Sequence, residues 1–306
     1  MYLIHHQLKL VANRSNLMKL FSLALVLITA TALGCGGHAA VTFNIKPDTE
    51  GLGQQIRDAA GGTGEAAEET AAAPATADAW GNLTGKFVIE GPPPTPTPLA
   101  ITKDEQVCGK HKLVDESVVI GKGGDGLKNV VVFLTDKKTP IHPDYEETAT
   151  ATVRFDNNHC RFEPHIMPLR TTQTLEIHNS DPVAHNSNLT PLGDAPFNQL
   201  ISENNATAYQ FHKQQNKPVA VTCSIHPWMK GYVFPRDNPY AAVTGEDGSF
   251  EIKNLPAGKH EFQVWQEAVG ELSAKPDWKK GKFKLEIQEG DNDLGTIPVA
   301  VSLLKK

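Results

Sequence analysis

A thiol, an imidazole and a thioether follow one another at intervals of three residues in this 306-residue chain. Cys223, His226 and Met229 stand in the segment 222–229, which reads Thr-Cys-Ser-Ile-His-Pro-Trp-Met. If a β-strand ends at the cysteine and turns into a tight loop, all three side chains can surround one ion. Thiolate and thioether groups are soft ligands, so the segment predicts a site for a soft transition metal.

A further ligand is expected from the segment 179–186, which reads Asn-Ser-Asp-Pro-Val-Ala-His-Asn and follows a predicted strand. It places His185 on a loop at one end of a β-structure. Two histidines, one cysteinate and a weak axial methionine form the type 1, or blue, copper site. This set of ligands fully suits neither copper(I) nor copper(II). If a rigid protein frame holds the ligands, the geometry of the site changes little when copper gains or loses an electron. The sequence predicts one mononuclear type 1 copper bound by His185, Cys223, His226 and Met229.

Short apolar runs and two-residue alternation dominate the chain after residue 80, and no long helical period appears there. Asp247-Gly248 is a turn pair between such segments. The pattern predicts an all-β body, a sandwich or Greek-key barrel. The expected strands lie within residues 86–90, 127–135, 153–155, 175–177, 219–221, 250–252, 262–264 and 283–287.

The N-terminus has the pattern of an export signal. Lys19 precedes an apolar run and then Leu-Gly-Cys at residues 33–35, which resembles a bacterial lipoprotein signal with Cys35 acylated. We therefore expect residues 1–34 to be removed and the protein to be exported, membrane-anchored and facing the periplasm or cell exterior. The alternative is a plain cleaved signal. Residues 35–79 are poor in large apolar side chains and predict a flexible tether.

The ligand segments resemble the cupredoxins, and among them the amicyanin and plastocyanin type. Cys223, His226, Pro227 and Met229 match the compact ligand loop of amicyanin, and the strand before Asn179 with His185-Asn186 matches the part that bears the first histidine. The resemblance covers about residues 171–235. It implies a cupredoxin-like Greek-key β-sandwich.

The same resemblance implies roles for the neighbours of the ligands. His226 is expected at the surface, with Pro227 and Trp228 in an apolar ring around it, and Asn186 is expected to bond across to the cysteine loop. The chain departs from the family at Ala184, which replaces a proline, and in residues 186–205, which predict a long polar loop.

Residues 242–265 resemble carboxypeptidase-regulatory or transthyretin-like modules, which are small β-sandwiches. Residues 83–93 resemble the first strand of such a module. We therefore expect a copper domain at 80–238, with an N-terminal β extension, and an additional β segment at 239–306. The two outer pieces either form one compound body around the central region or leave a separate C-terminal module.

Lipidation of Cys35 would leave three cysteines in an oxidising compartment. We expect a disulfide between Cys108 and Cys160, which leaves Cys223 free for the metal. The alternative is a disulfide from Cys223 to Cys108 or to Cys160. His165 and Met167 share one face if their segment is extended. They are either a second soft-metal pair or, as we expect, a hydrogen-bonded structural histidine and a core methionine.

The chain carries 29 basic and 35 acidic residues, a net charge of −6, which argues against a nucleic-acid partner. The predicted function is an electron carrier that exchanges single electrons with a redox protein of the cell envelope, and no catalytic residue is predicted. The alternatives are a copper-handling protein, a structural or carbohydrate-binding module with a vestigial metal site and, last, a copper oxidoreductase such as a nitrite reductase.

Overall fold

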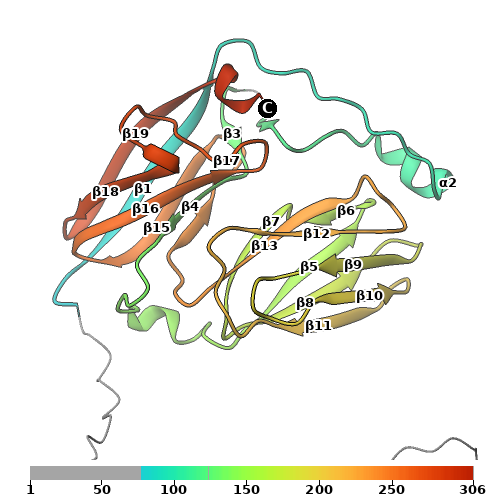
Figure 1. Cartoon of the computed structure of the whole chain (residues 1–306), viewed down its shortest axis with the longest axis horizontal. Coiled ribbons are helices and arrows are strands. Elements are labelled where there is room, and N and C mark those ends of the chain that lie inside the picture. The colour runs from blue at the N-terminus through green and yellow to red at the C-terminus, as the bar shows by residue number, and fades with distance from the viewer. Residues whose placement is uncertain (1–76, 123, 306) are drawn as a thin grey trace, which may run out of the picture. The chain divides into compact units, whose positions relative to one another are not determined.

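The computed structural model describes residues 77–122 and 124–305 (Figure 1). The predicted signal peptide, the acylated Cys35 and nearly all of the predicted tether lie outside these residues. Within the described part, no helix has the length and apolar character needed to span a membrane. The described residues form two groups of β-sheets, here called the sandwich and the flanking body.

The flanking body is built from both ends of the described chain. Strand β1 (Trp80–Glu90) pairs in antiparallel fashion with β15 (Ser249–Pro256) and in parallel with β19 (Gly290–Ala300) (Figure 1). Alternate residues of β1 are buried because one face of this sheet covers the core. The turn that precedes β15 contains Gly248 at φ +81°, a conformation that favours glycine, as the predicted Asp-Gly pair requires.

A second sheet of the flanking body contains the most apolar strand of the chain. Strand β4 (Val130–Leu134) lies between β14 (Ala241–Val243) and β16 (Gly258–Gln266), and all five of its residues are buried. The order continues to β17 (Gly270–Glu271), and β18 (Lys282–Ile287) also pairs with β16. Strands β2 (Val119–Ile120) and β3 (Leu127–Lys128) form a small ladder. These sheets combine residues from both sides of position 238, the predicted domain boundary.

The sandwich has two sheets and its own apolar core. One sheet has the order β11-β8-β5-β6, and the other has the order β10-β9-β12-β13-β7. Their bounds are β5 (Thr152–Asn158), β6 (Arg161–Glu163), β7 (Ile166–Arg170), β8 (Thr174–Asn179), β9 (His185–Leu189), β10 (Phe197–Ile201), β11 (Ala206–Gln210), β12 (Val219–Thr222) and β13 (Lys230–Arg236).

Two predictions of a loop are wrong. His185, expected on a loop at one end of a β-structure, is the first residue of strand β9. Residues 186–205, predicted as a polar loop, contain the paired strands β9 and β10. Polar side chains conceal them, because Asn186, Ser187 and Asn188 follow one another along β9. The prediction of an all-β fold is confirmed, since the described helices are α2 (Glu105–Cys108) and the short 3₁₀ turns η1 (Gly109–His111), η2 (Pro143–Tyr145), η3 (Lys279–Gly281) and η4 (Val301–Leu304).

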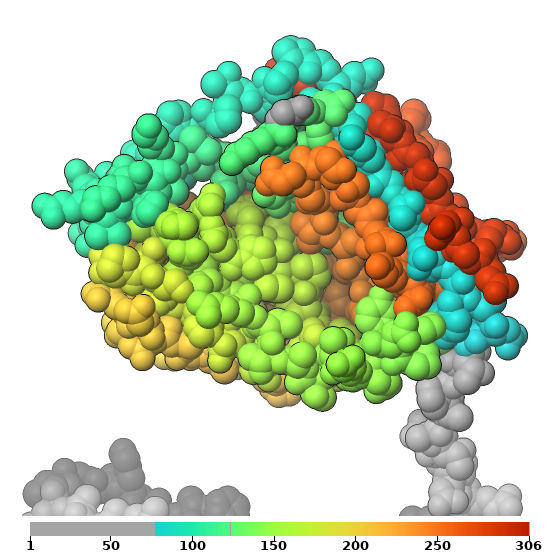
Figure 2. Space-filling view, turned by 180° about the vertical axis from the view of Figure 1, so that it is seen from behind, coloured from blue at the N-terminus to red at the C-terminus, as the bar shows by residue number. Residues whose placement is uncertain are grey.

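Residues 97–117, which we call the arm, lead from β1 toward β2 and lie over the sandwich. The two halves of the arm pair at Pro98 and Val114, and α2 and η1 form its tip (Figure 1). Cys108 and Leu113 of the arm are buried in the sandwich core. In space-filling representation the arm, in teal, runs along the yellow-green atoms of the sandwich (Figure 2).

Candidate metal centre

Cys223 follows directly after β12, and a short loop connects it to β13. The N–H of Met229 donates to the carbonyl of His226 at 2.9 Å, and the N–H of Cys223 donates to the carbonyl of Met229 at 3.3 Å. These two bonds fold the loop back on itself and hold all three residues near one end of the sandwich. The Cys223 and Met229 residues are 2% and 1% exposed, and His226 is fully buried.

His185 is the first residue of β9 and is also fully buried. Among the described residues its Nδ1 has no hydrogen-bond partner, although it is shielded from solvent. A buried imidazole nitrogen without a partner is costly in an apolar interior, unless it binds an ion. It therefore marks a position where a ligand atom is available.

The structure brings together three of the four predicted metal-binding side chains within a single cluster. One ligand atom each from His185, Cys223 and His226 lies within 4.8 Å of the others. Nδ1 of His226 is 3.7 Å from Sγ of Cys223, and the two imidazole ring centroids are 4.6 Å apart. Met229 lies near this cluster, because its backbone is hydrogen-bonded to both His226 and Cys223. One thiolate and two imidazoles beside a thioether are the donor set that copper takes in type 1 sites, so the residues fit that ion.

A second group of potential ligands overlaps the first but lacks a free thiolate. Cys160, Asp181 and His185 also lie within 4.8 Å of one another. Cys160 is bonded to Cys108, with an S–S distance of 2.03 Å. The predicted disulfide is thus present, Cys223 is a free buried cysteine, and the alternative pairing of Cys223 is wrong.

The environment of Cys223 favours its ionised form. Burial alone raises the pKa of a thiol, but the neighbouring imidazoles of His185 and His226 and the N–H of Asn186 outweigh burial and lower the pKa of Cys223 to about 6. Burial likewise lowers the pKa of His185, yet the neighbouring Asp181 and Cys223 raise it above its ordinary value. The thiolate, which is the form that binds metals, is therefore available at neutral pH.

Asn186 ties the two ligand segments together, as the resemblance implied. Its Oδ1 accepts a hydrogen bond of 2.6 Å from the N–H of Ser224, and its own N–H donates to Sγ of Cys223 at 3.4 Å. Its Nδ2 donates to Asn198 on the neighbouring strand β10. The thiolate thus has a backbone donor, and the loop after it is fixed to β9.

Each of the two histidines is paired with a carboxylate through its Nε2. Asp181 lies 2.9 Å from Nε2 of His185, and Asp104 lies 2.8 Å from Nε2 of His226. An outer partner of this kind fixes the tautomer and ring orientation of a metal-binding histidine and leaves Nδ1 for the ion. The sequence analysis missed both aspartates. Asp181 could have been found, because it lies four residues before His185 in the loop that leads into β9, whereas Asp104 is 122 residues from His226.

The expectation that His226 lies at the surface is wrong. Its side chain is 0% exposed, because Asp104 of the arm covers Nε2 and the ring of Trp228 lies 5.0 Å from its own. Pro227 is exposed and Trp228 is partly buried, with its Nε1 donating to the carbonyl of Cys160 at 3.2 Å. The arm covers His226, and no residue pattern in the sequence predicted the arm.

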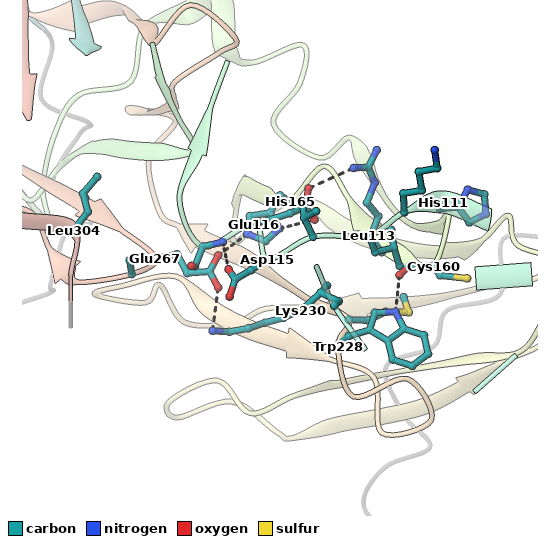
Figure 3. A pocket seen from close by; sticks show the side chains of 17 residues that line it. His111, Leu113, Asp115, Glu116, Cys160, His165, Trp228, Lys230, Glu267 and Leu304 are labelled. Carbon is teal, nitrogen blue, oxygen red and sulfur yellow. Dashed lines mark hydrogen bonds and ion pairs between the residues drawn. The ribbon is translucent and has the colours of Figure 1, made fainter. Parts of the chain in front are cut away.

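His165 serves the contact between the sandwich and the flanking body. Its Nε2 lies 2.5 Å from Glu267, which also pairs with Lys230 at 3.0 Å, and its Nδ1 is 3.7 Å from Glu116 (Figure 3). These side chains line a cavity of about 470 Å³ that Met229 and Trp228 also border. The expectation of a hydrogen-bonded structural histidine is confirmed. Met167 packs against the sandwich core, as expected.

Comparison with known proteins gave matches to solved structures only; no family model and no curated protein matches the chain. A copper-containing nitrite reductase from Thermus scotoductus SA-01 matches at 22% identity, over 28% of this chain and 22% of the reductase, with a TM-score of 0.26. This chain thus covers about a fifth of that enzyme. A purple cupredoxin from Nitrosopumilus maritimus matches at 19% identity, over 27% of this chain and 98% of its own, with a TM-score of 0.24. The copper(I) form of an amicyanin mutant matches at 18% identity, over 34% and 98%, with a TM-score of 0.26.

Proposed function

We propose that the chain binds one copper ion in a type 1 site and carries single electrons between redox partners. His185, Cys223 and His226 are the strong ligands, and Met229 is the weak axial ligand. The observation that carries this proposal is the buried cluster of one low-pKa thiol and two imidazoles, with Nδ1 of His185 left without a partner. Copper in such a site changes its oxidation state by one electron with little change in geometry.

The residues around the cluster supply the rigidity that this function needs. Strand β9 carries His185, strand β12 ends directly before Cys223, and the two strands pair at Val221 and Leu189. Asn186 adds a side-chain tie from β9 to the N–H of Ser224. Asp181 and Asp104 hold the imidazole rings by their Nε2 atoms, which leaves Nδ1 of each ring for the ion.

The proposed setting is the cell envelope, with a lipid anchor at Cys35 and a redox protein as partner. The disulfide between Cys108 and Cys160 supports an oxidising compartment, where such bonds persist. A lipid anchor with a tether would keep the protein near membrane-bound partners at raised local concentration.

The full chain loaded with copper(II) tests this proposal through its visible absorption spectrum. We expect an intense thiolate-to-copper band that is absent in Cys223→Ser, a change that retains the size of the side chain but removes the thiolate. A folded protein that binds copper(II) without this band would contradict the proposal.

A second candidate is the handling of copper(I), and one observation favours it. The side chains of both histidines are fully buried, so neither ring offers an exposed edge to a redox partner. Copper(I) held tightly by the same residues, with no stable blue copper(II) form, would support this candidate.

A further inference from the structure

Cys160 contacts the surroundings of the metal centre in three ways. Its N–H donates to Asp181 at 2.8 Å, its carbonyl accepts from Nε1 of Trp228 at 3.2 Å, and its sulfur is bonded to Cys108. Asp181 holds Nε2 of His185, and the ring of Trp228 packs beside His226. Cys160 thus contacts both Asp181, which bonds His185, and Trp228, which packs beside His226.

Cys108, at the other end of the disulfide, belongs to the turn that carries the second carboxylate. It is the last residue of α2, and its N–H donates to the backbone carbonyl of Asp104 at 2.8 Å. The N–H of Val107 donates to the same carbonyl at 2.8 Å. The carboxylate of Asp104 reaches Nε2 of His226 from this turn. The disulfide therefore joins the turn that presents Asp104 to the turn that binds Asp181.

Three residues in these two turns have a left-handed backbone, which is unusual for side chains larger than glycine. They are Asp104 (φ +45°), His159 (φ +56°) and Cys160 (φ +54°). The turn between β5 and β6 needs positive φ at both central residues, where Asn-Gly is the usual choice. Such conformations persist where the surroundings over-determine them. Here the N–H groups of His159 and Cys160 both bind the carboxylate of Asp181.

We propose that the arm is a cap on the copper centre, in which Asp104 and Asp181 are positioning residues for His226 and His185 and the Cys108–Cys160 disulfide fastens both. The inference rests on the proposed function, because it assigns roles around the same centre. Asp104 is 43% exposed while His226 is 0% exposed, so the carboxylate stands between the imidazole and solvent. The cap fixes the orientation of the imidazole and slows the exchange of copper with the solution.

Two variants of the full chain remove the cap by different routes. Asp104→Ala removes the carboxylate but keeps the disulfide, and the pair Cys108→Ser with Cys160→Ser removes the disulfide but keeps the carboxylate. The control is Glu105→Gln, a neighbouring exposed residue of the arm that pairs with no described side chain. Loss of copper(I) to excess bicinchoninate is followed in each protein by absorbance.

We expect each change to accelerate copper loss by about tenfold or more, the range found when outer partners of metal ligands are removed. Glu105→Gln should leave the rate unchanged, and Asp104→Asn should restore much of the slow rate, because its amide oxygen still accepts from Nε2. The three substitutions together should be no faster than the disulfide variant alone, since the cap is already open there. The copper hyperfine splitting in electron paramagnetic resonance should change in Asp104→Ala, because the ring of His226 turns.

A measurement without copper separates failure of the cap from failure of the metal site. Hydrogen exchange of arm amides in the apo-protein should be accelerated in both cap variants. If the wild-type chain takes up no copper while arm exchange responds in this way, the proposed function fails and the arm contact with His226 stands. Unchanged copper loss and unchanged arm exchange in folded Asp104→Ala would overturn the cap, whatever the disulfide variant does.

Discussion

Nδ1 of His226 lies 3.7 Å from Sγ of Cys223, with both groups buried. Thiolate sulfur and imidazole nitrogen bind a first-row ion such as zinc at about 2.3 and 2.0 Å, so two such ligands in a tetrahedral arrangement lie about 3.5 Å apart. The observed spacing therefore suits two groups that share one ion.

Met229 is expected to influence the reduction potential of the copper centre without being required for copper binding. In Met229→Leu the blue band should persist, while the reduction potential should rise, because loss of a weak donor destabilises copper(II) more than copper(I). Redox titration of the absorption band measures this shift. Met167→Leu, in a methionine packed elsewhere against the same core, should leave the potential unchanged. Loss of copper binding in Met229→Leu would instead make Met229 a strong ligand.

Asn186 is expected to contribute to stability as well as to the site. Asn186→Ala leaves the N–H of Ser224 and the side chain of Asn198 without their partner. We expect a loss of about 1–2 kcal/mol in the free energy of unfolding of the apo-protein, measured by urea denaturation. Asn188→Ala on the same strand, whose side chain has no described partner, is the control. Equal effects of the two changes would argue against the tie.

Copper binding should depend on the protonation of Cys223. Its pKa is about 6 in the folded protein, below the ordinary value of 9.0. The thiolate therefore contributes to the stability of the folded apo-protein fully above pH 9, and this contribution is lost as the pH falls through about 6. Ultraviolet absorbance of the thiolate in the apo-protein should titrate near pH 6, and copper uptake should weaken below that pH. A midpoint near 9 would contradict the hydrogen bonds assigned to the sulfur, and Cys223→Ser should show no titration.

Glu267 is expected to hold the sandwich to the flanking body. Burial raises its pKa, but His165 and Lys230 lower it below its ordinary value, so it is ionised at neutral pH. Glu267→Gln removes the buried carboxylate that pairs with His165 and Lys230, and it should cost about 2 kcal/mol in unfolding free energy. Thermal denaturation of the variant and of Glu271→Gln, an exposed neighbour, measures this. A similar change in both would show that Glu267 has no special role.

The predictable parts of the fold and site are those written in short stretches of sequence. The spacing of Cys223, His226 and Met229 predicts one loop, and assigning Cys223 to the metal favours the disulfide between Cys108 and Cys160. Strand β4 was predictable because its five residues are all apolar and all buried.

The parts of the fold and of the site that could not be predicted depend on contacts between residues far apart in the sequence. The arm reaches the metal centre across 122 positions, from Asp104 to His226, and no periodic pattern carries that information. Likewise, the pairing of β1 with β19 links residues more than 200 positions apart. Strand β9 was missed because its buried residues Asn186 and Ser187 are polar, so the strand carries no apolar alternation.

Reversible electron exchange by the copper-loaded full chain tests the central claim most directly. In a spectroelectrochemical titration we expect a single one-electron step for each bound copper, with the blue band bleached on reduction and fully restored on oxidation. Stable binding of copper(I) with no reversible step, or loss of the ion on oxidation, would contradict the assignment as an electron carrier and favour copper handling by the same residues.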